Sequence, residues 1–246
     1  VQTCALPISS GYSAIVVLGD SMQSDSPVVS DLGRVVAAAE EQIKGLNYPE
    51  ANQMLEDAIR VAPDSDPGLE EARLLLAETS LIVGRWERVQ RELERILEAP
   101  SRPEVEIRAL LASGELLSNR GEPEEAREYF SKAVQAADNA QLGRWSITCS
   151  VRLAALAGQT GEMDIYRSLL EKAEEQCRQF QDDPEWAELN AALDTQWGLY
   201  FFRLSQRPQA EERLRKALDG LRNGLHSSLE EPTILRYLGV MASLRR

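Results

Sequence analysis

From Asp31 onward, apolar residues recur at helical spacing and alternate with charged ones. This pattern predicts pairs of amphipathic helices, in which each helix buries one face against its partner. The clearest copy runs from Ile107 to Asp138, with two helices joined at Asn119–Pro123. A small residue recurs inside the first helix of each copy, at Ala39, Ala77, Gly114, Ala154, Gly198 and Gly239.

Three positions of the second helix keep a constant distance from that small residue in the first five copies. Twelve residues after it lie Ala51, Val89, Ala126, Tyr166 and Ala210. Four residues further on lie Leu55, Leu93, Phe130, Leu170 and Leu214. Three beyond those lie Ala58, Ile96, Ala133, Ala173 and Ala217. Successive small residues are 38, 37, 40, 44 and 41 apart, so we expect the hairpin to be the packing unit and the connections to absorb insertions.

Start and stop signals agree with these boundaries. Proline falls in the first turn of second helices, where a missing N–H costs least, at Pro49, Pro123 and Pro208. Glycine stands seven residues after the small residue, where a tight turn is expected, at Gly84, Gly121 and Gly161. Pro63 and Pro100 close second helices, and residues 183–185 and 228–231 carry N-terminal cap signatures.

The pattern resembles the tetratricopeptide repeat family, in which Gly in the first helix is followed by A-x3-F and then Ala in the second. Gly114 with Ala126, Phe130 and Ala133 matches this signature, and the resemblance covers roughly residues 31–246. It implies an all-α fold, a right-handed α-solenoid of about five stacked antiparallel hairpins plus one terminal helix.

The chain departs from the family signature in three ways. Tyr166 replaces a small residue, and the large residue expected early in the first helix is missing at Arg73, Ser150 and Asp194. The period also exceeds the roughly 34 residues typical of the family. Such stretched units resemble the arrays of bacterial signalling ATPases and transcriptional activators.

We divide the chain into three segments. Residues 1–8 lack an initiator Met, periodicity and a cap, and resemble a translated sequencing adapter, so we predict a non-native segment. Residues 9–31 form a linker or the remnant of an upstream domain, and residues 32–246 form the repeat domain. The last copy holds one helix from Pro232, and Gly239 calls for a partner about twelve residues on, so we expect a fragment of a larger protein.

The charge and cysteine content of the chain indicate which kinds of partner and compartment to expect. Lys and Arg total 27 against 40 Asp and Glu, a net charge of −13, which argues against binding nucleic acid or an anionic membrane through this segment. A solvated acidic surface explains the charge, with a basic partner as the alternative. Cys149 and Cys177 fall within helical patterns without metal-ligand spacing, which favours buried thiols in the reducing cytoplasm.

Catalysis finds little support in the residues. Gly19-Asp20-Ser21 invites a hydrolase interpretation, but the single histidine, His226, lies far away and leaves the serine without a base. Carboxylate pairs such as Glu124 and Glu125 stand at helix starts, where they favour the helix dipole. No nucleotide-binding loop or metal motif is present in the sequence. We therefore expect no enzyme, cofactor or metal site.

The resemblance implies a binding groove on the first helices, whose inner faces line a concave surface in this family. Register places there Leu74, Glu78, Leu81, Ile82, Leu111, Glu115, Val151, Ala155, Leu199 and Phe202. These residues are not the Lys and Asn that clamp a carboxylate in chaperone adaptors, so we expect an amphipathic helix or extended peptide of a protein partner. The alternative for each apolar residue is packing between adjacent repeats. The predicted function is an interaction scaffold, or alternatively the sensor region of an ATPase-linked bacterial transcriptional regulator.

Overall fold

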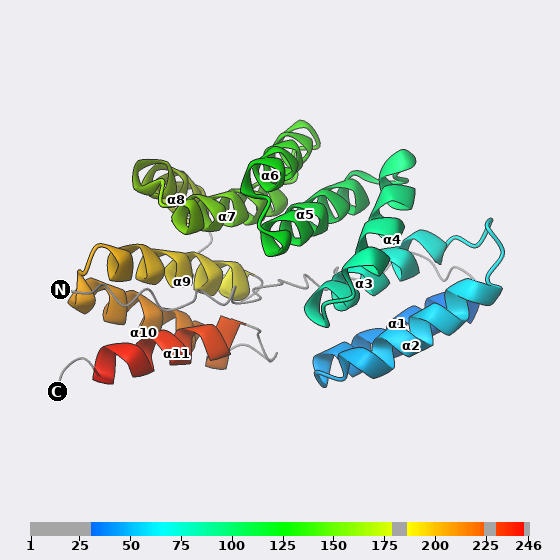
Figure 1. Ribbon diagram of the computed structural model, residues 1–246, viewed down its shortest axis with the longest axis horizontal. Helices are drawn as coiled ribbons and strands as arrows, with labels where there is room; N and C mark the ends of the chain where they lie inside the picture. Colours follow the sequence, from blue (N-terminus) through cyan, green and yellow to red (C-terminus); the bar gives the residue numbers. More distant parts are fainter. Residues whose placement is uncertain (1–30, 179–185, 224–229, 244–246) are drawn as a thin grey trace.

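The computed structural model describes residues 31–178, 186–223 and 230–243, and all regular secondary structure in these ranges is helical. The predicted all-α class is therefore confirmed (Figure 1). The helices are α1 (Asp31–Lys44), α2 (Tyr48–Val61), α3 (Leu69–Ile82), α4 (Trp86–Glu98), α5 (Pro103–Arg120), α6 (Pro123–Asn139), α7 (Gly143–Thr160), α8 (Met163–Cys177), α9 (Ala187–Arg203), α10 (Arg207–Asn223) and α11 (Glu230–Ser243).

The helices form a solenoid of antiparallel hairpins. Each odd-numbered helix from α1 to α9 packs against the helix that follows it, and each also contacts the next odd-numbered helix. Figure 1 shows a curved array, with α5 and α7 on its inner side and α6 and α8 on its outer side. The predicted five hairpins and terminal helix are confirmed for the described residues, while the right-handed sense stays a prediction.

Small residues bring the two helices of a hairpin into close contact. A Cβ atom on Gly114 would lie 2.5 Å from the ring of Phe130, and one on Gly198 would lie 2.6 Å from Leu214. Phe130 and Leu214 are almost completely buried. A side chain at either glycine would push the two helices apart. The glycine of the first helix therefore leaves room for the large residue of the second helix, Phe130 or Leu214, to pack directly against the backbone.

Tyr166 departs from the signature, and the structure shows what accommodates it. A Cβ atom on Gly158, four residues after Ala154, would lie 2.5 Å from the Tyr166 ring. The Tyr166 hydroxyl is 2.8 Å from both the backbone oxygen and the side-chain Oε1 of Gln196 in α9. The larger Tyr166 side chain therefore packs on Gly158, one helical turn after the usual small residue, and its hydroxyl connects this hairpin to the next.

The missing large residues at Arg73 and Asp194 are replaced by ion pairs inside the hairpin. Arg73 of α3 faces Glu92 of α4, with Nε and Oε2 3.7 Å apart. Asp194 of α9 faces Arg213 of α10, with Oδ1 and Nη1 2.6 Å apart. Both pairs stand at the same register, nineteen residues apart in sequence, with acid and base exchanged.

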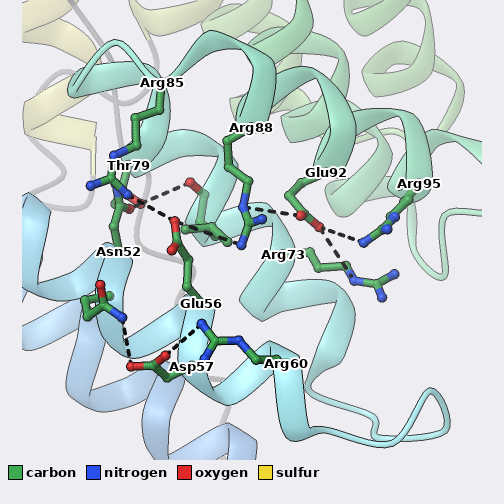
Figure 2. Close-up of polar contacts among 12 residues, drawn as sticks. Asn52, Glu56, Asp57, Arg60, Arg73, Thr79, Arg85, Arg88, Glu92 and Arg95 are labelled. Atoms are coloured by element: carbon green, nitrogen blue, oxygen red, sulfur yellow. Dashed lines mark hydrogen bonds and ion pairs between the residues drawn. The ribbon is translucent and has the colours of Figure 1, made fainter.

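Glu92 is the most deeply buried carboxylate in this group, with 1% of its side chain exposed. Figure 2 shows Arg73, Arg88 and Arg95 converging on it. The Arg88 and Arg95 nitrogens lie 3.5 and 3.7 Å from the carboxylate oxygens. Arg88 also approaches Glu56 of α2, which connects the first two hairpins on their outer side.

Several predictions fall on residues that the structure does not describe. They concern residues 1–30, with Cys4 and Gly19-Asp20-Ser21, the cap signature at 183–185, and His226. The domain boundaries at residues 8 and 31 stay predictions for the same reason. Pro232 lies within α11, as predicted.

Candidate functional site

The inner layer of the array is built from α1, α3, α5, α7 and α9, which contact one another in sequence. The residue directly after the small residue is half-buried in all five helices. It is a carboxylate in the first three helices and apolar in the next two: Glu40, Glu78, Glu115, Ala155 and Leu199. We call this row the groove row.

Arg108 of α5 neutralises part of the acidic end of the groove row. Its Nη2 and Nε donate to the two oxygens of Glu78 at 2.8 and 3.0 Å, and its Nη1 donates to Glu71 Oε1 at 2.5 Å. Burial opposes the charge on Arg108, but the two carboxylates outweigh it and raise its pKa. Such bidentate pairing fixes α5 against α3.

The other two carboxylates of the groove row are less well compensated. Burial raises the pKa of Glu40, and the negative charge of Glu71 raises it further. Burial also raises the pKa of Glu115, against the opposing charge of Arg152. Glu115 Oε1 lies 3.4 Å from Arg152 Nε, and among the described residues Arg152 Nη2 has no hydrogen-bond partner. The α5–α7 junction thus holds a buried guanidinium with an unused donor.

The predicted groove residues divide into two groups. Leu74, Leu81 and Val151 lie in the hydrophobic core, at most 4% exposed. For these three the expected groove position is corrected, because they pack between helices as the alternative interpretation described. The others are half-buried: Glu78, Ile82, Leu111, Glu115, Ala155, Leu199 and Phe202. Phe202 also packs edge-on against Tyr237 of α11, with ring centroids 5.1 Å apart.

Four charged residues of this surface were missed at the sequence level: Glu40, Glu71, Arg108 and Arg152. A signal existed for three of them. Glu71 and Arg108 both stand six residues before the small residue of their helix. Glu40 follows its small residue directly, as Glu78 and Glu115 do. Arg152 has no such counterpart, so only the structure identifies it.

The described residues hold no group of three or more His, Cys, Asp or Glu side chains suited to a metal ion. Burial, with the charge of Asp138, raises the pKa of Cys149 to about 12, and burial raises that of Cys177 to about 11. Both thiols are therefore protonated at neutral pH and poor nucleophiles. None of the helices in the described ranges is both long and apolar enough to cross a membrane.

Neither a protein-family model nor a curated protein matches the chain by sequence. Solved structures match it by fold. A Rap protein complexed with competence and sporulation factor aligns at 13% identity over 89% of this chain and 66% of that chain, with a TM-score of 0.60. PilW, a widely conserved type IV pilus biogenesis factor, aligns at 19% identity over 78% of each chain, with a TM-score of 0.56.

BtubC from P. vanneervenii aligns at 18% identity over 87% of this chain and 84% of that chain, with a TM-score of 0.56. Rap and PilW are tetratricopeptide-type proteins. The chain therefore has a tetratricopeptide-type repeat fold, which confirms the resemblance seen in the sequence. At these identities the comparisons establish the fold alone.

Proposed function

We propose that this chain is a protein-interaction scaffold that binds a peptide or helix of a partner protein along the groove row. The observation that carries the proposal is the uniform, half-buried position of Glu40, Glu78, Glu115, Ala155 and Leu199 on adjacent helices. An unbroken row of this kind is suited to an elongated ligand rather than to a compact one.

The chemistry of the row indicates which partner segment it accepts. Glu40 and Glu115 are partly desolvated carboxylates whose raised pKa reflects incomplete compensation. A partner cation or N–H donor would stabilise their charge. Ala155 and Leu199 offer apolar contact further along the row. We therefore favour an amphipathic segment with donor groups toward α1–α5 and apolar side chains over α7–α9.

The structure of the Rap protein is a complex with competence and sporulation factor, which supports a binding role for this fold. A non-catalytic role and a cytoplasmic location, inferred from the sequence, belong to the same proposal. So does the alternative that the array is the sensor region of a larger transcriptional regulator. A partner that binds the groove row would serve either role.

The test uses Ala155→Arg and Leu199→Arg, which add length and positive charge at the apolar end of the row, on α7 and α9. A partner recovered with the wild-type chain should be lost or bound at least about ten-fold more weakly by both variants, a change of about 1.4 kcal/mol in binding. Ile165→Arg is the matched control, because Ile165 is 46% exposed on the outer helix α8.

Circular dichroism must show that all three variants keep the wild-type helix content and melting temperature. Unchanged partner binding by both groove variants would refute the groove. Equal loss in Ile165→Arg would place the binding surface on the outer helices instead.

A further inference from the structure

The outer side of the second hairpin carries a surplus of positive charge (Figure 2). Among the described residues, four arginines lie within 3.9 Å of two carboxylates, Glu56 of α2 and Glu92 of α4. The six groups therefore carry a formal charge of +2, in a chain whose net charge is −13. We call the four arginines the arginine cluster: Arg73, Arg85, Arg88 and Arg95.

The contacts around Glu92 are too long to satisfy the guanidinium donors. Nitrogen atoms of Arg73, Arg88 and Arg95 lie 3.5–3.7 Å from the Glu92 oxygens, whereas a guanidinium–carboxylate hydrogen bond measures about 2.7–2.9 Å. Arg73 Nε, Arg88 Nε and Glu92 Oε2 are buried, and none of them has a hydrogen-bond partner among the described residues. Three arginines thus share one carboxylate, which completes the hydrogen bonding of none of them.

The fifth hairpin shows how this array balances a similar cluster. Arg213 donates to Asp194 at 2.6 Å and to Glu174 at 2.8 Å, and Lys216 lies 3.0 Å from Asp194. Two cations therefore meet two carboxylates at hydrogen-bond distance, and the group has no net charge. Lys216 stands at the register position of Arg95, eighteen residues after the small residue of its hairpin. By comparison, the cluster in the second hairpin lacks negative charge.

The surplus charge is accessible from solvent. The Glu92 side chain is 1% exposed, whereas Arg88 is 28% exposed and Arg95 is 48% exposed. The carboxylate therefore lies beneath the guanidinium groups, whose outer sides are open to a ligand. An anion can approach the cluster from solvent without displacing Glu92.

We propose that the arginine cluster binds a phosphate monoester dianion, carried by a phosphorylated side chain of a partner protein or by a small phosphorylated compound. A phosphate monoester has a charge of about −1.5 to −2 at neutral pH and three strong acceptor oxygens. It would balance the surplus charge and accept hydrogen bonds from Arg73, Arg88 and Arg95, because the planar guanidinium group suits phosphate oxygens.

A single phosphate group fits the cluster better than an extended polyanion. The arginines surround one buried carboxylate, while the chain as a whole has a net charge of −13, so a nucleic acid that extended beyond the cluster would meet an acidic surface. The arginine cluster shares no residue with the groove row, so the inference does not depend on the proposed function.

The first experiment measures the melting temperature of the complete chain in potassium phosphate and in potassium chloride of equal ionic strength. Phosphate should raise the melting temperature of the wild-type chain, because a ligand that binds the folded state stabilises it. Arg95→Gln should lose most of this gain. Arg167→Gln is the matched control, because it removes the same charge from an exposed pair in α8, and it should keep the gain. The control also accounts for the general stabilisation that phosphate salts give to folded proteins.

Glu92→Gln tests the charge balance from the opposite direction. The amide keeps nearly the same shape but removes the negative charge, so phosphate should bind at least about ten-fold more tightly than to the wild-type chain. If Glu92 served folding stability alone, the variant would melt at a lower temperature and its affinity for phosphate would not change.

Peptides that carry one phosphoserine among varied flanking residues identify the source of the phosphate group. Peptides that bind at least about ten-fold more tightly than inorganic phosphate would assign the site to a phosphorylated partner protein, and their absence would assign it to a free phosphate compound. The selected peptide with glutamate in place of phosphoserine should bind at least about ten-fold more weakly, because its single charge leaves part of the surplus unbalanced.

Three results would overturn the proposal. The first is a melting temperature that is the same in phosphate and in chloride. The second is an equal gain from phosphate in the wild-type chain and in Arg95→Gln. The third is a glutamate peptide that binds as tightly as its phosphoserine counterpart, which would show that the cluster accepts any carboxylate and does not select a phosphate group.

Discussion

One backbone position in each hairpin turn adopts the left-handed conformation. It stands seven residues after the small residue and has φ between 60° and 83° at Leu46, Gly84, Gly121, Gly161 and Ser205. Glycine adopts this conformation without steric cost, but for other residues it costs roughly 1–2 kcal/mol. The first and fifth turns therefore carry backbone strain that the other three avoid.

Replacing Leu46 with glycine should stabilise the protein. The gain from relieved strain is reduced by the extra entropy that glycine has in the unfolded chain, so we expect a net increase of about 0.5–1 kcal/mol in the free energy of unfolding. Leu46 is 50% exposed, so little apolar burial is lost. Urea denaturation of the variant and the wild-type chain measures the change.

Gly121→Ala is the converse variant, because φ is 80° at this position and a Cβ atom would meet no described residue within 4 Å. It should lower the free energy of unfolding by about 1 kcal/mol through backbone strain alone. A destabilising Leu46→Gly would show that contacts of the leucine side chain outweigh the strain.

Within the hairpin, the residue four positions before the small residue faces the residue nineteen positions further along the chain. These two positions hold an apolar contact in some hairpins and an ion pair in others. Leu110 and Tyr129 fill them in the third hairpin, where both belong to one apolar cluster. Arg73 and Glu92 fill them in the second hairpin. A buried ion pair stabilises little relative to a well-packed apolar pair, but the loss of one partner is costly because the other charge stays buried.

This asymmetry predicts a non-additive double mutant. Glu92→Leu should lower the free energy of unfolding by about 3 kcal/mol, since Arg73, Arg88 and Arg95 lose their shared carboxylate. Arg73→Leu combined with Glu92→Leu should cost about 1 kcal/mol, because it restores the apolar pair found in the third hairpin. Denaturation of the two single variants and the double variant gives the coupling energy. Additive losses would show that Arg88 and Arg95, rather than Arg73, depend on Glu92.

The contacts within a hairpin were largely predictable because the helices are joined by short turns and keep one register. The constant offsets identified Phe130 and Leu214 as the residues that pack on the first helix, and both are buried. The repeated offset of nineteen residues could also have identified the two ion pairs. The packing of Tyr166 on Gly158 was not predicted, because Gly158 lies one helical turn after the expected small residue, Ala154.

Contacts between hairpins were harder to predict. They depend on how each helix is rotated toward its neighbour, which the register within a hairpin does not determine. Leu74, Leu81 and Val151 were expected to line the groove but lie in the core for this reason. The charged residues Arg108 and Arg152 reach across hairpins, and their long side chains leave little trace in an apolar pattern.

At the scale of the whole molecule, extensive contacts between the described helices join neighbouring hairpins, so stability is approximately a sum of hairpin and interface contributions. Arg108 is the main polar contact of the α3–α5 interface, because it is 11% exposed and binds both Glu71 and Glu78. Loss of this side chain should therefore weaken one interface rather than the entire array.

Arg108→Ala leaves two half-buried carboxylates without their principal cation, and we expect a loss of about 3 kcal/mol at this interface. Hydrogen–deuterium exchange should become faster in α1 to α4, which lie on one side of the interface. Exchange in α9 and α10 should not change, because the extensive contacts of these helices, as far as the structure describes them, are with one another and with α7, α8 and α11. Arg167→Ala, which removes an exposed pair with Glu171 in α8, should leave exchange unchanged throughout. Faster exchange in α9 and α10 after Arg108→Ala would mean that the solenoid unfolds as one cooperative unit, and that its hairpins do not act as separable neighbours.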